Sequence, residues 1–195
     1  MTQEPIPQEI IDEMVVASHH DLRRVQEMLA ENPNLLNENA TWIETPIQAA
    51  AHVGNRPIAE YLLEQGAPLD ICTAAMLGQI DDVKALLAEA PELSGATGAH
   101  NIPLMFFAAL SDNTDVAQTL YDAGADVNAG EGGNTPLHGA AIFGRMNTLR
   151  WLLSHDANPY AVDYEGKTPL DRARDNGHED AVALLLPFFE ETDGA

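Results

Sequence analysis

Residues 124–144 have the sequence Gly-Ala-Asp-Val-Asn-Ala-Gly-Glu-Gly-Gly-Asn-Thr-Pro-Leu-His-Gly-Ala-Ala-Ile-Phe-Gly. This stretch predicts the end of one helix, a glycine-rich finger and a new helix that starts at Thr135-Pro136. Proline suits the first helical turn because its missing N–H would have no partner there and its fixed φ is helical. Ala140-Ala141 keeps the new helix thin, so a neighbouring helix can approach closely. Gly144 supplies the left-handed residue that ends the helix.

The same pattern recurs along the chain at a period of about 33 residues, which indicates stacked units that bury their apolar faces against one another. The opening recurs at Thr168-Pro169-Leu170, and a degenerate copy occurs at Ile102-Pro103-Leu104. Earlier copies are Asp70 with Ala74-Ala75 and Gly78, Thr45-Pro46-Ile47 with Ala50-Ala51 and Gly54, and Asp12 with Val16-Ala17.

These residues resemble the ankyrin repeat family, whose pattern is a turn, Thr-Pro-Leu-His-x-Ala, a paired-alanine helix, a glycine, a second helix and Gly-Ala-Asp-x-Asn. The resemblance implies an all-α solenoid of about six helix-turn-helix units with short β-hairpin-like fingers. We expect a flexible tail at residues 1–7, a repeat domain at 8–189 and an acidic tail at 190–195. The expected units are 8–40, 41–66, 67–97, 98–129, 130–162 and 163–189.

One interval departs from the family pattern. Gly66-Ala67-Pro68-Leu69-Asp70 runs almost directly into the next paired-alanine helix, about nine residues short of the usual period. We therefore predict that one finger is missing near residues 66–70, which leaves a gap between the unit of Pro46 and the unit of Asp70. The deletion is either harmless, since loops tolerate change, or it forms a notch for a ligand.

The composition indicates which partners and compartments fit the chain. Its formal net charge of −22 is spread along the whole chain and should repel nucleic acids and anionic membranes. The charge is either an adaptation for solubility or high salt, or a surface matched to a basic partner. The sequence contains no run of about 18 apolar residues, so it predicts no membrane span. A single cysteine excludes an internal disulfide framework, and a cytoplasmic location is expected.

Residues with catalytic or metal-binding chemistry do not form a familiar motif. The seven histidines include no pair at i and i+4 on one helix with a carboxylate, so the sequence predicts no metal site. The family resemblance implies that His138 forms a structural hydrogen bond with Thr135 and the turn backbone. Cys72 should be buried and inert. We expect no catalytic residue, no cofactor and no enzyme activity.

The resemblance places the finger tips and the ends of the first helices on a concave face. In the middle units, the two residues before each first-helix glycine are apolar, and a contiguous apolar row of this kind is typical of protein interfaces. Loss of the finger could instead bury Met76 and Leu77 internally. The residues expected to contact a partner are Trp42, Val53, Met76, Leu77, Leu110, Ile142, Phe143, Tyr164, Glu165 and Lys167.

The leading hypothesis is a non-catalytic, monomeric module that binds a protein or peptide with basic residues around an apolar anchor. One alternative is an acidic decoy that occupies the cationic site of another protein, such as a nucleic-acid-binding protein. Its binding would weaken steeply with salt. Another alternative is a small-ligand or enzyme site in the notch left by the missing finger.

Overall fold

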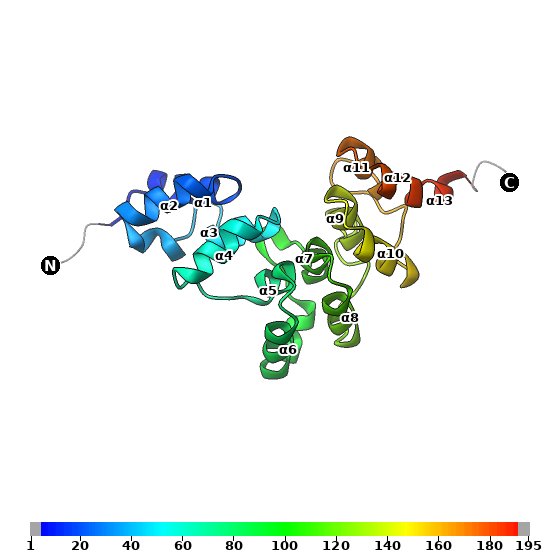
Figure 1. Ribbon diagram of the computed structural model, residues 1–195, viewed down its shortest axis with the longest axis horizontal. Helices are drawn as coiled ribbons and strands as arrows, with labels where there is room; N and C mark the ends of the chain where they lie inside the picture. The colour runs from blue at the N-terminus through cyan, green and yellow to red at the C-terminus, as the bar shows by residue number, and fades with distance from the viewer. Residues whose placement is uncertain (1–4, 191–195) are drawn as a thin grey trace.

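Antiparallel helix pairs follow one another along a curved row (Figure 1). The computed structural model of the protein describes residues 5–190. The first helices of the pairs are α1 (Gln8–Ser18), α3 (Pro46–His52), α5 (Ile71–Leu77), α7 (Leu104–Ser111), α9 (Pro136–Ile142) and α11 (Pro169–Asp175). The second helices are α2 (Leu22–Glu31), α4 (Arg56–Glu64), α6 (Ile80–Glu89), α8 (Thr114–Asp122), α10 (Met146–Ser154) and α12 (Glu179–Leu185). Short helices complete the chain: η1 (Pro33–Asn37), η2 (Pro91–Gly95), η3 (Ala99–Asn101) and α13 (Pro187–Glu190).

This arrangement confirms the predicted all-α solenoid of stacked helix pairs. The predicted tails lie for the most part outside the described residues. Between residues 5 and 190, no helix combines the length and the apolar character that crossing a bilayer requires.

The first helices start where the sequence predicted, because their caps satisfy backbone N–H groups that have no partner within the helix. The hydroxyl groups of Thr45, Thr135 and Thr168 accept bonds from the backbone N–H three residues later, and each threonine precedes a proline at the first helical position. The side-chain oxygen of Gln48 accepts a hydrogen bond from the backbone N–H of Thr45, which completes a capping box.

The core lies between the two layers of helices. The paired alanines of α3, α5, α7 and α9 are fully buried, and they let α1, α3, α5, α7, α9 and α11 pack side by side in one row. The second helices cover this row from outside. Helix α2 contacts α4, and α8 contacts α6 and α10, which in turn contacts α12. Figure 1 shows α6 set apart from α4, so the outer row is interrupted at the shortened unit.

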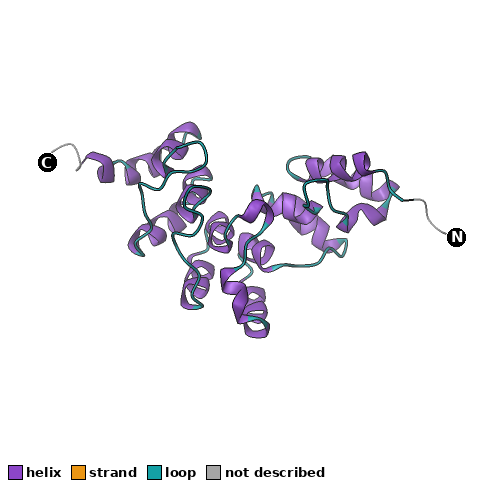
Figure 2. Ribbon diagram, turned by 180° about the vertical axis from the view of Figure 1, so that it is seen from behind, coloured by secondary structure: helices purple, strands orange, loops and turns teal. Residues whose placement is uncertain are grey.

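The fingers consist of turns. Helices and loops make up the described part of the chain in Figure 2, and the bridge between Thr97 and Pro103 is an isolated one. Several finger residues have positive φ, including Gly130, Gly132 and Gly166. Glycine adopts this conformation without the steric cost that other residues incur. The fingers of the described chain therefore reverse direction as a hairpin does, but they are formed by turns and not by paired strands.

The shortened connection between α4 and α5 lacks a finger, as predicted. Residues 65–70 join the two helices directly. The finger of the fourth unit, which contains η3, packs against α3 of the second unit. Residues of the second and fourth units consequently meet across the third unit.

Candidate binding groove and histidine cluster

Two adjoining clefts run between the fingers and the ends of the first helices, and together they are called the groove below. The larger cleft has a volume of about 690 Å³ and the smaller one about 290 Å³. They share His52, Ile102, Asn134 and Tyr164 as lining residues. The larger cleft is also lined by His100, Asn101, Pro103 and residues 130–133, and the smaller one by Val53, Phe106, Ile142, Phe143, Arg172 and Asn176.

Three of the predicted partner contacts form an apolar wall of the smaller cleft. Val53, Ile142 and Phe143 are half-buried and lie at the C-terminal ends of α3 and α9. A Cβ on Gly54 would lie 3.7 Å from a ring carbon of Phe143, so the two helix ends approach each other closely. The Ile142 carbonyl also contacts a ring nitrogen of His178 at 2.9 Å, which ties α9 to the last unit. The wall is thus formed by separate repeats and fixed by their packing.

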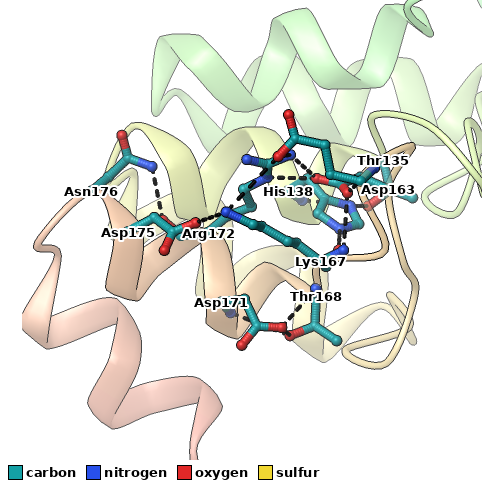
Figure 3. A network of polar contacts seen from close by, with 10 residues as sticks. Thr135, His138, Asp163, Lys167, Thr168, Asp171, Arg172, Asp175 and Asn176 are labelled. Carbon is teal, nitrogen blue, oxygen red and sulfur yellow. Dashed lines mark hydrogen bonds and ion pairs between the residues drawn. The ribbon is translucent and has the colours of Figure 1, made fainter.

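The last finger places one other predicted contact beside this wall. Tyr164 is exposed and lines both clefts, whereas Glu165 and Lys167 follow it in the same turn but do not line either cleft. Figure 3 shows the polar network beneath this turn, which is centred on Asp163 and Arg172. The Asp163 carboxylate accepts bonds from the backbone N–H groups of Glu165 and Lys167 at 2.8 and 3.0 Å. It also contacts two nitrogens of Arg172 at 2.5 Å.

His138 joins this network from the preceding unit. One of its ring nitrogens lies 2.7 Å from the Thr135 hydroxyl and the other lies 3.0 Å from the Lys167 carbonyl (Figure 3). The first contact confirms the predicted bond with Thr135. The second connects neighbouring repeats, so His138 also fixes the position of the last finger.

The network predicts that acid destabilises the fold. Burial raises the pKa of the Asp163 carboxyl, but the backbone N–H groups and Arg172 outweigh this effect and hold its pKa below the usual value. Burial lowers the pKa of His138, an effect that its bond to the Lys167 carbonyl opposes only partly. Both groups bind protons more weakly when folded, so the free energy of unfolding falls as the pH decreases.

The loss due to His138 begins below about pH 6.5, and the loss due to Asp163 begins below about pH 4. Urea unfolding between pH 7 and about pH 3 measures both effects. His138→Gln should reduce the fall in the free energy of unfolding between pH 7 and pH 5. A free energy of unfolding that is higher at pH 5 than at pH 7 would contradict the expectation.

Three of the predicted contacts do not face the groove. Met76, Leu77 and Leu110 are each less than 5% exposed. Without a finger in the third unit, the end of α3 lies close to α7: a Cβ on Gly54 would be 3.7 Å from Leu110 Cδ1. The expectation that these three side chains face solvent is therefore wrong, and the alternative of internal burial holds for Met76 and Leu77.

Trp42 is partly exposed but belongs to a different feature of the surface. Its indole N–H donates a 2.7 Å hydrogen bond to Oε2 of Glu44, whose side chain is 1% exposed. Trp42 does not line the groove, and its bond shows that it helps to hold a buried carboxylate.

Glu44 is surrounded by histidines from three repeat units. Its carboxylate lies 2.8 Å from Nδ1 of His52, 3.6 Å from Nε2 of His100 and 3.8 Å from Nε2 of His19. These four residues are called the histidine cluster below. Burial raises the pKa of Glu44, but contacts with His52, Trp42 and His19 outweigh this and keep its pKa below the usual value. The prediction from helical spacing missed this convergence because its members come from three repeats and no two of them are spaced four residues apart on one helix.

The sequence comparisons agree with the architecture. A family model described as "Ankyrin repeats (3 copies)" matches residues 71–163 and 104–193, and one described as "Ankyrin repeat" matches residues 44–74. The chain belongs to the ankyrin repeat family. Ankyrin repeats are protein-interaction modules and are generally non-catalytic, which supports the general class of function inferred from the sequence.

Several known proteins contain a similar ankyrin segment. The putative E3 ubiquitin-protein ligase XBAT34 of Arabidopsis thaliana is 41% identical over 109 residues, which are 54% of this chain and 29% of that protein. Ankyrin repeat and SOCS box protein 11 of Danio rerio is 31% identical over 131 residues, 67% of this chain and 36% of that protein. Inversin of Gallus gallus is 32% identical over 118 residues, 60% of this chain and 11% of that protein. The matches therefore cover between 11% and 36% of these three relatives.

Proposed function

We propose that this ankyrin repeat chain is a non-catalytic module that binds an extended protein or peptide segment in the groove. The observation that carries the proposal is the apolar wall of Val53, Ile142 and Phe143, which is only half-buried and opens onto a cleft. Half-buried apolar and aromatic side chains grouped in a cleft are typical of interface centres. Tyr164 adds a second exposed aromatic ring at the edge of the wall.

The charge of the chain favours a basic partner. The net charge of −22 creates an attractive potential for Lys and Arg, and Glu131 lines the larger cleft directly. Long-range attraction of this kind mainly increases the rate of encounter, whereas burial of an apolar anchor slows dissociation. The proposed partner segment therefore carries an apolar or aromatic anchor with basic residues on either side.

Replacing Ile142 and Phe143 together by serine should weaken partner binding by roughly 100-fold or more, since each buried anchor typically contributes about 2 kcal/mol. The experiment captures partners from lysate on the immobilised chain and identifies them by mass spectrometry. The affinity of a captured segment is then measured for the wild type and the variant. The melting temperature should change little because both side chains are half-buried.

The matched control is Ile10→Ser with Val16→Ser, because both side chains are exposed apolar residues of α1, away from the groove. This control should bind as the wild type does. Unchanged binding by the Ile142 and Phe143 variant would refute the proposed groove. Binding that falls steeply with salt and ignores the variant would favour the acidic decoy instead.

The rest of the proposed function follows from the family and from the chain's own residues. The lack of enzyme activity is proposed because ankyrin repeats are generally non-catalytic. A monomeric state is proposed because the stacked repeats bury their own apolar faces. A cytoplasmic location is proposed from the single cysteine, which is buried in α5.

A further inference from the structure

Only one oxygen of the buried Glu44 carboxylate has a well-formed hydrogen bond, the one that Oε2 accepts from the Trp42 indole. The Oε1 atom of Glu44 and the neighbouring Nδ1 of His52 are both buried, and neither has a hydrogen bond of good geometry although they lie 2.8 Å apart. Within 4 Å, the described residues offer Glu44 only histidines as ion-pair partners. A buried carboxylate is costly unless a cation or hydrogen-bond donors compensate its charge.

The orientation of His19 fits a metal ligand. Its Nδ1 lies 2.9 Å from the carbonyl of Val15, so this nitrogen is the donor, and Nε2, which is the ligand atom of the neutral ring, faces Glu44 at 3.8 Å. Metal-binding histidines commonly donate their second ring nitrogen to a backbone carbonyl in this way. The His19 carbonyl accepts a 3.1 Å bond from Asn55, which fixes its backbone to the second repeat.

The spacing of the donor atoms fits a single small ion. One donor atom each from His19, Glu44 and His52 lies within 4.8 Å of the other two. Ligands about 2.0–2.1 Å from a tetrahedral zinc ion are roughly 3.3 Å from one another. Glu44 Oε1 lies 2.8 Å from Nδ1 of His52 and 3.6 Å from Nε2 of His100, and Oε2 lies 3.8 Å from Nε2 of His19, so the distances from the carboxylate lie on either side of this value. Lone pairs that converge on a shared ion also explain why Glu44 and His52 are close without a proper hydrogen bond.

The missing finger brings the fourth residue into place. His100 lies in η3, the finger that packs against α3 because the third repeat has none. His100 and Asn101 have φ values of 57° and 58°, and Ile43 next to Glu44 has a φ of 62°. Such values are rare for residues other than glycine, above all for the β-branched Ile43, and backbone strain of this kind is frequent at functional sites.

We propose that the histidine cluster binds one Zn²⁺ ion through Nε2 of His19, the carboxylate of Glu44 and Nδ1 of His52, with Nε2 of His100 as the fourth ligand. Nitrogen donors favour zinc over calcium or magnesium. The ion neutralises the buried carboxylate and joins the first, second and fourth repeats. Because His52 and His100 also line the groove, the ion fixes one of its walls.

The experiment titrates Zn²⁺ into the full chain after treatment with a chelator and measures heat, stoichiometry and melting temperature. One ion should bind per chain. A concentration of a hundred times Kd should raise the melting temperature by about 5–10 °C. Mg²⁺ at the same concentration should produce neither heat nor a shift. Co²⁺ should give the visible absorption of a tetrahedral site.

The variants Glu44→Gln and His52→Ala should weaken zinc binding by at least about 100-fold, since even groups behind a ligand contribute about 10–100-fold. His100→Ala keeps the test decisive if those variants fail to fold, because this half-exposed finger residue can be removed with little loss of core packing. It should lower the affinity by at least about tenfold.

His20→Ala is the matched control, because His20 is exposed beside His19 and outside the cluster. It should bind zinc as the wild type does. An unchanged melting temperature with zinc, or equal losses in His20→Ala and His100→Ala, would overturn the proposal. The cluster would then be a set of hydrogen-bonding side chains only. Because the assay uses zinc alone, its outcome is independent of partner binding in the groove.

Discussion

Replacing Asp163 by alanine should lower the free energy of unfolding by about 3 kcal/mol, because it removes the buried partner of Arg172 and leaves this cation only the half-exposed Glu165 carboxylate at 3.1 Å. The Asp163 side chain is fully buried and that of Arg172 is 14% exposed. The substitution also leaves the N–H groups of Glu165 and Lys167 without their acceptor. The last finger should loosen as a result, and urea unfolding with a global fit measures the loss.

The control for this prediction is Asp175→Ala. Asp175 contacts Lys167 at 2.5 Å, but both side chains are more than a third exposed, so the loss should stay below about 1 kcal/mol. The double variant Asp163→Ala with Arg172→Met should recover part of the stability, since it removes the unpaired charge. Equal losses for Asp163→Ala and Asp175→Ala would show that burial of the pair has no energetic role.

Replacing Phe107 by alanine should cost about 3–5 kcal/mol through lost burial and a cavity at the centre of the stack. Phe107 is 1% exposed and contacts Phe106 edge to face, with ring centroids 6.0 Å apart. Its ring also fills the space beside Gly98, where a Cβ would lie 2.5 Å from the ring. Phe107 therefore supports the finger of the fourth repeat as well as the core.

Phe188→Ala is the matched control, since this ring is 37% exposed at the end of the solenoid. It should lower the free energy of unfolding by less than about 1 kcal/mol. Because a repeat stack can lose stability locally, hydrogen exchange should locate the Phe107 effect in α5, α7 and the finger between them. Protection there that equals the wild type would contradict the expected cavity.

The sequence predicted much of the groove because the repeat period assigns each residue a place on the solenoid. Val53, the adjacent residues Ile142 and Phe143, and Tyr164 belong to different repeats, and the structure brings them together along the groove. This inference depended on the resemblance to the ankyrin repeat family, which places the finger tips and the ends of the first helices on one face. Whether they bind a partner is part of the proposed function.

The repeat period gave a wrong prediction of side-chain exposure where the spacing of the units departs from it. Met76, Leu77 and Leu110 occupy the same pattern positions but are buried, because neighbouring repeats close over the unit that lacks a finger. A sequence pattern specifies a residue's place within one repeat. It does not specify how closely the next repeats approach when a spacer between them is lost.

The histidine cluster shows the same limit more clearly. A search for ligands four residues apart on one helix could not find His19, Glu44, His52 and His100, which come from separate turns and helix ends. One signal was present in the sequence: His19 and His52 both lie where a first helix ends, about one repeat apart. No comparable signal pointed to His100, since its approach depends on the packing of η3 against α3.

The sequence by itself determined the local structure: the threonine caps, the thin alanine-paired helices, the turn glycines and the repeat period. These features depend on backbone geometry and on contacts within one repeat or between adjacent ones. Only the tertiary structure decided which side chains meet across repeats. Omission of one finger changed the distance between the second and fourth units, buried three side chains and brought a third imidazole to the Glu44 carboxylate.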